Sequence, residues 1–176
     1  MTSAETMLDV PFDLDASSLM EKACVEAGTD DEKEFAELLS TARGLARPKA
    51  MYRECFVEVR GKSTVTFGGI TFSSHVLRIN LEKAERVFAY IATCGTELDQ
   101  VPLPPGDSLK EYWRDTIKTA LLWCAMDHLN QRLTQKFALG KTSTMNPGSG
   151  DANVWPIEQQ KELFSLLGDV EGEIGV

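Results

Sequence analysis

The longest apolar pattern in the chain constrains its fold most, because it requires one long helix that other elements must cover. Across residues 107–139, apolar side chains recur at helical spacing in one wide stripe. Ser108 and Glu111 fit a capping box at its start, and Gly140 follows its end. Trp123 broadens the stripe, which favours a buried central helix over a coiled-coil strand. The stripe comprises Leu109, Trp113, Ile117, Ala120, Leu121, Cys124, Leu129, Leu133 and Phe137.

Two shorter helices are predicted before the long one. The first begins at Asp15 or Ser18, both of which are good N-cap residues, and ends at Gly28. The second begins at residues 29–30 and ends before Pro48, because a proline ring does not continue a helix easily. The segment that precedes both helices, residues 8–14, contains a proline and is predicted as an edge strand or an extended arm.

The period of the pattern changes from helical to alternating at Met51. Residues 51–60 alternate between apolar and polar, as expected of a half-buried strand. Gly61 then provides a tight turn into a return strand at residues 64–67, which gives a hairpin. Gly68 and the glycine after it break this strand.

The next two segments differ in how clearly they can be interpreted. Residues 70–81 fit either a short helix capped by Ser73 or Ser74, or an extended segment, and we favour the helix. Residues 86–93 form a dense apolar and aromatic run of strand length that ends in a glycine turn. This run predicts a central strand.

The order of these elements predicts the fold class. Helices, strands and one long helix follow one another without the alternation of βαβ units, so we expect an α+β fold with a mostly antiparallel sheet packed with helices. The length of 176 residues and the 43% hydrophobic content fit a single domain over residues 1–176. We expect the long helix to cover the strand at residues 86–93 through Trp113, Ile117, Leu121 and Cys124.

Charge and hydropathy exclude several classes of partner. The net charge of -9 would repel phosphates, and the basic residues are scattered singly, so we expect no nucleic acid partner. The sequence has no apolar run of about 18 residues, the length that a membrane span needs, and it lacks a basic, apolar N-terminal signal. We therefore expect a cytoplasmic protein with no membrane partner.

The four cysteines do not predict a metal centre. Zinc and iron–sulfur sites usually draw their ligands from close pairs of cysteines. Cys24, Cys55, Cys94 and Cys124 are instead widely separated in the sequence. We expect them to be buried thiols in a reducing compartment, and we expect no tightly bound metal.

A glycine-rich loop joined to a short helix is the most distinctive segment of the chain. The loop at residues 146–151 has few side chains that can pack, so its backbone N–H and C=O groups can approach a ligand or another chain closely. Pro156 marks the start of the helix and Gly168 its end. Its predicted apolar face consists of Leu163, Phe164 and Leu167.

Three features resemble the activation (reactivation) domain of vitamin B12-dependent methionine synthase and the small free-standing proteins related to it. They are residues 92–95 at the end of a strand, the long helix near residues 112–133, and the loop-plus-helix segment MNPGSGD…WPIEQQKELFSLLG. The last of these is the most specific. The resemblance covers nearly the whole chain and implies the α+β fold of that domain.

The resemblance also implies a ligand and a partner. In that family the loop binds S-adenosylmethionine, whose methyl group restores an oxidised cobalamin carried by a partner protein. The chain is therefore expected to be an accessory module that works with a corrinoid-binding or methyltransferase protein, with cobalamin reached only through that partner. The residues that correspond to the loop are Asn146, Pro147, Gly148, Ser149, Gly150 and Asp151.

This chain departs from the family pattern at both ends of the loop. Asn146 stands where the family has an arginine that grips the methionine carboxylate, and Asp151 stands where it has a tyrosine. Losing a charge-assisted bidentate pair costs roughly 1.5–3 kcal/mol, so binding is expected to be weak, altered or lost. Family members also continue with a further strand, so the start of a strand is expected after Gly168 and the C-terminus is expected to be incomplete.

Two functional interpretations follow, from different classes. The first is an activation or binding module that holds S-adenosylmethionine or a related ligand, and the second is a protein-interaction scaffold for a corrinoid protein with no small-molecule ligand. An independent enzyme is not favoured, because the sequence has no Ser/His/Asp grouping and no phosphate-binding loop. Asp127 is a further candidate ligand-binding residue, although a polar flank of a buried helix is the favoured interpretation.

Overall fold

The computed structural model describes residues 3–148 and 154–176, and it contains two compact units. We call the first the sheet unit; it comprises Met1–Thr6, Met51–Ile91 and Leu139–Glu173. The second, the helical unit, comprises Met7–Ala50, Ala92–Ala138 and Ile174–Val176. Helices and strands both contribute, and they follow the predicted order of helices, strands and one long helix. The predicted α+β class is confirmed.

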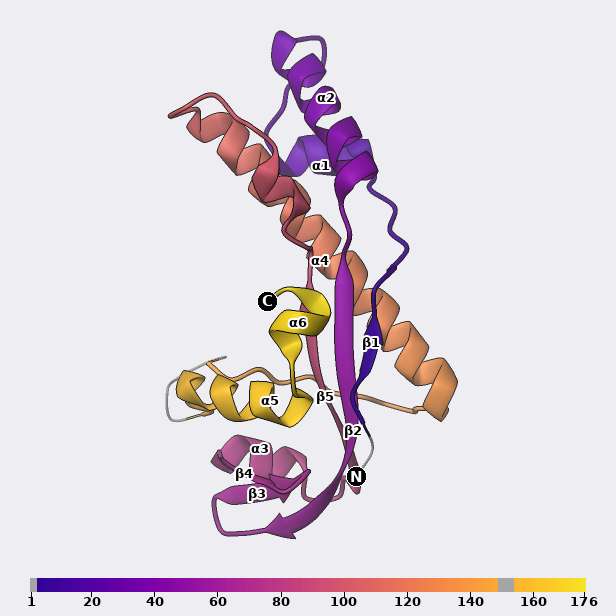
Figure 1. Cartoon of the computed structure of the whole chain (residues 1–176), viewed down its shortest axis with the longest axis vertical. Helices are drawn as coiled ribbons and strands as arrows, with labels where there is room; N and C mark the ends of the chain where they lie inside the picture. Colours follow the sequence, from indigo (N-terminus) through magenta and orange to yellow (C-terminus); the bar gives the residue numbers. More distant parts are fainter. Residues whose placement is uncertain (1–2, 149–153) are drawn as a thin grey trace. The chain divides into compact units, whose positions relative to one another are not determined.

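One curled sheet of five strands forms the scaffold of the sheet unit (Figure 1). Four strands follow the order β1-β2-β3-β4, and the fifth, β5, pairs with β2. The β2–β3 and β3–β4 pairs are antiparallel, and the first of them is the predicted hairpin. The strands are β1 (Glu5–Met7), β2 (Lys49–Arg60), β3 (Thr64–Phe67), β4 (Ile70–Ser73) and β5 (Arg86–Thr93).

Gly68 and Gly69 end β3, as predicted, and they also form the turn of a second hairpin that was not predicted. Gly68 and Gly69 have φ values of 59° and 79°, and a two-residue type I′ turn needs positive φ at both central positions. The chain therefore returns as β4 before it enters α3 (His75–Asn80). Both alternatives considered for residues 70–81 thus occur, one after the other. Ser74 caps the helix, since its side chain accepts a hydrogen bond from Leu77 N.

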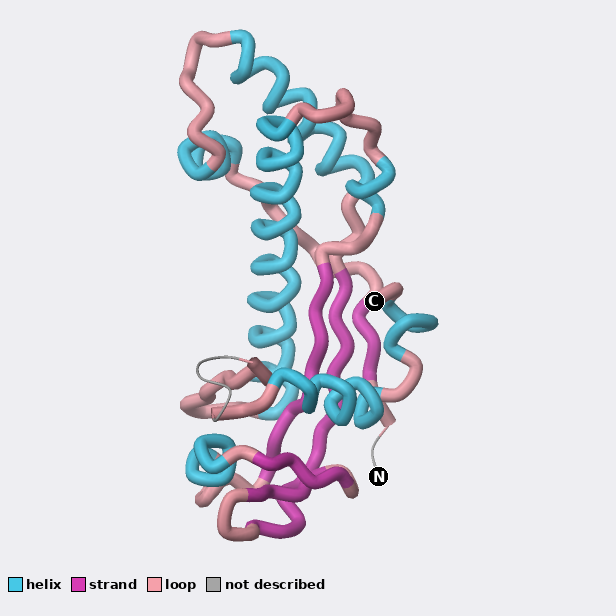
Figure 2. The backbone as a smooth tube through the Cα atoms, turned by 90° about the vertical axis from the view of Figure 1, so that its left-hand side faces the viewer, coloured by secondary structure: helices cyan, strands magenta, loops and turns pink. Residues whose placement is uncertain are grey.

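The helical unit contains α1 (Ala16–Lys22), α2 (Asp30–Leu45), the 3-10 turn η1 (Glu97–Gln100) and α4 (Ser108–Phe137). Figure 2 shows α4 as one continuous helix. Thr29 caps α2, whereas aspartates cap the other two helices: Asp15 accepts from Ser18 N at 3.1 Å, and Asp107 accepts from Lys110 N at 3.0 Å. Asp15, one of the two caps predicted for the first helix, is thus confirmed. The capping box predicted at Ser108 is wrong, because the carboxylate of Asp107 takes a free N–H group of the first turn.

The core of the helical unit is built around the N-terminal half of α4. Trp113, Ile117 and Leu121 belong to a buried cluster whose other members come from α1, α2, η1 and the segments beside them. Phe35 meets Trp113 edge to face, with ring centroids 5.7 Å apart. The helices α1 and α2 thus supply apolar surface to these α4 residues. The expected packing on the strand at residues 86–93 stays a prediction, because that strand belongs mainly to the other unit. The residues of this buried cluster outside α4 are Leu14, Leu19, Ala23, Phe35, Leu39, Ala42, Ala46 and Leu98.

The C-terminal residues form helices rather than the strand predicted after Gly168. Helix α5 (Gln160–Leu167) ends at Gly168, and α6 (Val170–Ile174) follows. Asp169 starts α6, because its carboxylate accepts from Gly172 N at 3.0 Å. Val170 and Ile174 are both buried. Apolar residues four apart fit one helix face as well as they fit alternate strand positions, which explains the error.

Among residues 3–148 and 154–176, no helix combines the length and hydropathy needed to cross a bilayer.

Replacing Leu121 by Ala tests the packing of α4. Leu121 is 0% exposed, so the change should leave a cavity and lower the free energy of unfolding by about 2–5 kcal/mol. Leu109 belongs to the same helix but is 47% exposed, so Leu109→Ala should change the unfolding free energy by about 0.5 kcal/mol or less. Urea titrations of both variants provide the comparison. Equal effects would show that Leu121 is not a core residue.

Candidate functional site

The candidate site is the segment 145–168 of the sheet unit, which the structure describes in two parts, residues 145–148 and 154–168. Ser149, Gly150 and Asp151, which the sequence analysis also proposed, lie outside the described residues. Asn146 and Gly148 are exposed, whereas Pro147 between them is buried. Pro147 therefore anchors this part of the segment, and the residues before and after it face solvent.

A backbone hydrogen bond closes the base of the loop. Gly148 N donates to Trp155 O at 2.8 Å. Gly148 has φ +80°, and a Cβ atom at this position would lie 3.0 Å from Cδ1 of Ile157. Both the left-handed backbone and the close approach of Ile157 therefore require glycine here. The sequence analysis placed Gly148 in the loop but assigned it no such role.

Trp155 anchors the far end of the loop in the core of the sheet unit. Its side chain is 4% exposed, and its ring meets Phe72 edge to face at 5.9 Å. Phe72 in turn stacks on Phe67, with centroids 4.5 Å apart. Sequence reasoning missed this role, although a tryptophan directly before Pro156 at the start of a helix was a usable signal.

Ser74 ties the same end of the loop to the corner between β4 and α3. Its hydroxyl accepts a hydrogen bond from Leu77 N at 3.0 Å and donates one to Val154 O. At the other end of the loop, Asn80 of α3 donates to the sulfur of Met145 at 2.8 Å. The sequence identified Ser74 as a helix cap, but no local pattern indicates that a cap also holds a segment 80 residues away.

The helix after the loop ends before Gly168 as predicted, but its α-helical part begins at Gln160 rather than at Pro156, and it faces differently. Pro156 precedes a 3-10 turn, η2 (Ile157–Gln159), which leads into α5. Gly168 ends α5 with a positive φ of 95°. Leu166 and Leu167 are buried, whereas Phe164 is 38% exposed, so the predicted apolar face is wrong at Phe164. One helical turn of 3-10 geometry rotates the face relative to a pure α-helix.

The described part of the site favours binding over proton transfer. The exposed positions offer an amide side chain at Asn146 and backbone groups at Gly148, which recognise ligands through hydrogen bonds. General acid–base catalysis needs a group that titrates near the working pH, and neither kind of group does so. His75, at the start of α3, is an exposed residue, and we assign it no role in the site.

Asp127 belongs to the other unit. It is an exposed residue of α4, in the helical unit, whereas Asn146, Pro147 and Gly148 belong to the sheet unit. An exposed carboxylate on a long helix with a buried opposite face fits the polar-flank interpretation. We assign Asp127 no role in binding.

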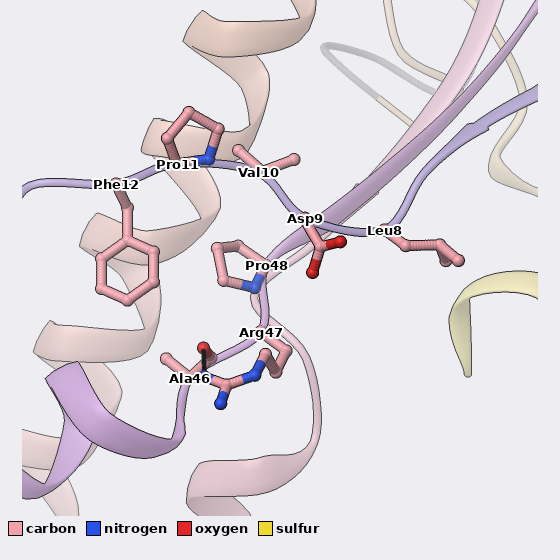
Figure 3. A pocket seen from close by; sticks show the side chains of 8 residues that line it. All are labelled: Leu8, Asp9, Val10, Pro11, Phe12, Ala46, Arg47 and Pro48. Atoms are coloured by element: carbon pink, nitrogen blue, oxygen red, sulfur yellow. Dashed lines mark hydrogen bonds between the residues drawn. The ribbon is translucent and has the colours of Figure 1, made fainter.

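An open cleft of about 490 Å³ lies in the helical unit (Figure 3). The segment 8–12 lines one side, and Ala46, Arg47 and Pro48 line the other. Residues 8–14 have no regular secondary structure, so the extended-arm alternative holds. Arg47 Nη1 donates to Gly44 O and Ala46 O, at 3.2 and 2.7 Å. This guanidinium therefore satisfies carbonyls at the end of α2 instead of pointing a free charge into the cleft.

The cysteines are free thiols in different environments. Cys55 is buried and Cys24 is exposed, so the expectation of burial holds for the first and is wrong for the second. Burial raises the pKa of the thiols of Cys55 and Cys94, which makes both poorer nucleophiles. Helix α1 ends at Lys22 and not at Gly28, where its end was predicted. Cys24 lies just after this end, with φ 54°.

Comparison with known proteins does not assign the chain to a family. No protein-family model matches it, and no curated protein sequence matches it significantly.

The expected absence of a tightly bound metal stays a prediction. Within residues 3–148 and 154–176, no three His, Cys, Asp or Glu side chains are grouped closely enough to hold a metal ion. Elemental analysis of protein purified without a metal-binding tag should find less than stoichiometric zinc and iron. One equivalent of either metal would overturn the expectation.

Replacing Gly148 by Ala tests the geometry at the base of the loop. The left-handed backbone costs an alanine about 1–2 kcal/mol, and the contact with Ile157 adds to this cost, so unfolding should become easier by at least that amount. Gly140 is the matched control, because it has no positive φ and no atom lies within 4 Å of a Cβ placed there. Gly140→Ala should be neutral or slightly stabilising in the same urea titration. Equal stability of the two variants would contradict the account of Gly148.

Proposed function

We propose that the chain is an accessory binding module of a corrinoid-dependent methyl-transfer system. In this proposal the loop that begins at Asn146 faces S-adenosylmethionine or a related adenosyl ligand, and cobalamin is carried by a partner, a corrinoid-binding or methyltransferase protein. The observation that carries the proposal is the loop-plus-helix segment, MNPGSGD…WPIEQQKELFSLLG, which resembles the ligand-binding loop of methionine synthase activation domains. The module binds and presents the ligand rather than catalysing a reaction alone.

The anchoring of the loop supports a binding role. A site recognises its ligand best when its residues are held in place before the ligand arrives. Trp155 and Pro147 are buried, and the Gly148–Trp155 hydrogen bond joins the two ends, while Asn146 stays exposed.

The chemistry available to the chain is recognition of the ligand's polar groups. S-adenosylmethionine, when bound, would supply the methyl group that restores an oxidised cobalamin once an electron is provided. Asn146 would offer its amide to the methionine carboxylate, as a neutral donor in place of the family arginine. Gly148 would allow the backbone to approach the ligand, because it has no side chain.

A cytoplasmic location forms part of the proposal. All four cysteines are free thiols, including the exposed Cys24. Free thiols persist in compartments that are kept reduced. Such a compartment suits a protein that works beside a corrinoid methyltransferase.

The second candidate function is a scaffold that contacts a corrinoid protein and binds no small molecule. Asn146 favours this alternative, because a neutral amide replaces the charged group that would hold the ligand carboxylate. The loop would then serve as a contact surface. The two functions differ in one measurable property, the affinity for S-adenosylmethionine.

Calorimetric titration with S-adenosylmethionine separates the two functions. We expect weak binding by the native protein, and Asn146→Arg should tighten it by about tenfold or more, since a charge-assisted pair contributes roughly 1.5–3 kcal/mol. Asn130→Arg is the matched control, because it adds the same charge at an exposed position of α4. It should leave the affinity unchanged. Absence of binding in both the native protein and Asn146→Arg, with the fold intact, would exclude the adenosyl ligand and leave the scaffold function.

A further inference from the structure

The side chain of Gln159, in η2, joins three groups from separate parts of the sheet unit. Its Oε1 accepts a hydrogen bond from Ser73 N at 3.0 Å and a second from the indole Nε1 of Trp155 at 3.1 Å. Its Nε2 donates to Ser73 O at 3.3 Å. One carboxamide therefore satisfies a backbone donor, a backbone acceptor and a buried indole.

On one side, Gln159 replaces a missing neighbour strand. Ser73 is the last residue of β4, and β4 ends the strand order of the sheet. An edge strand presents N–H and C=O groups that a further strand would otherwise pair. The carboxamide of Gln159 bonds both groups of Ser73 in the same manner. These two hydrogen bonds fix the side chain to the β3–β4 hairpin.

On the other side, Gln159 fixes the residue that closes the loop. Gln159 accepts a hydrogen bond from the indole of Trp155. The backbone O of Trp155 in turn accepts from Gly148 N at 2.8 Å. Gly148 directly follows Asn146-Pro147. A continuous series of hydrogen bonds thus runs from the edge of β4, through Gln159 and Trp155, to the exposed residues at the start of the loop.

Glutamine is the side chain that this position requires. The arrangement needs one oxygen that accepts two hydrogen bonds and one nitrogen that donates to a carbonyl. A glutamate retains the acceptor but places a second oxygen against Ser73 O. A methionine has a similar length but lacks both groups.

We propose that Gln159 is a positioning residue for the loop, acting through Trp155 to hold Gly148 and Asn146 in place for a ligand. The role of the loop in binding rests on the proposed function above, whereas the coupling from Ser73 to Gly148 does not. A purely local role is the alternative, in which Gln159 covers the edge of β4 and nothing else. The two roles differ in whether a substitution of Gln159 changes the amide of Ser73 alone or also that of Gly148.

Amide hydrogen exchange measured by NMR on the unliganded protein distinguishes these roles. In Gln159→Met, Ser73 N loses its acceptor, and Trp155 loses the hydrogen bond that holds it against Gln159. Exchange at Ser73 N and at Gly148 N should therefore both accelerate by about tenfold or more. The indole N–H signal of Trp155 should move toward the position of a free indole. Gln159→Glu should keep that indole signal near its native position, because its acceptor oxygen remains. Gln160→Met is the control, as Gln160 is the exposed next residue.

Acceleration at Ser73 with exchange at Gly148 unchanged would overturn the proposal in favour of the local role. If Gln159→Met does not fold, exchange of the native protein in low urea replaces it. The coupling predicts that the amides of Ser73 and Gly148 and the indole of Trp155 open together, with the same dependence on urea. Opening of Ser73 independently of Gly148 would again overturn the proposal.

Titration with S-adenosylmethionine then connects the positioning role to binding. In the Asn146→Arg background, adding Gln159→Met should weaken the affinity by about tenfold, whereas adding Gln160→Met should not change it. Equal affinities with and without Gln159→Met would overturn the positioning role. If the Asn146→Arg protein binds nothing, the proposed function fails, and the exchange result still decides whether Gln159 controls Gly148.

Discussion

Burial of the Trp155 ring against Phe72 is the interaction on which the candidate site depends. A buried tryptophan removes about 150–250 Å² from water, which contributes roughly 4–6 kcal/mol. Fixing the backbone of three residues costs about 3–6 kcal/mol. Burial of one ring can therefore offset the ordering of Asn146, Pro147 and Gly148, with the Gly148–Trp155 hydrogen bond setting their geometry. Without this anchor the exposed residues would have no fixed arrangement to present.

The two units are stabilised in different ways. The helical unit has a core of side chains from α1, α2 and α4, centred on the edge-to-face pair of Phe35 and Trp113. The sheet unit depends on aromatic stacking around Phe72 and on side chains that bond to the backbone of distant segments. Polar tethers of this kind fix direction as well as distance, because hydrogen bonds weaken steeply when they bend. A loop that must hold a defined geometry is better served by such tethers than by apolar contacts alone.

Much of the fold could be predicted from local patterns, and the predictions that were wrong have physical causes. The strands β3 and β5 begin and end where the sequence indicated, because alternation and glycine turns are local signals. Helix α6 was predicted as a strand, since Val170 and Ile174 satisfy both periods. In the site, proline and glycine signalled the loop, but the tethers from Ser74 and Gln159 join residues about 80 positions apart. Sequence spacing carries no information about such contacts.

The central claim, that the loop is a preorganised binding site, is tested most directly by NMR chemical shifts. The ¹⁵N-labelled native protein is titrated with S-adenosylmethionine, and the shift of every backbone and indole N–H is followed. The account predicts changes concentrated at Asn146, Gly148 and the indole of Trp155. Changes confined to the cleft formed by segment 8–12 and Ala46–Pro48, or no changes at millimolar ligand, would contradict it.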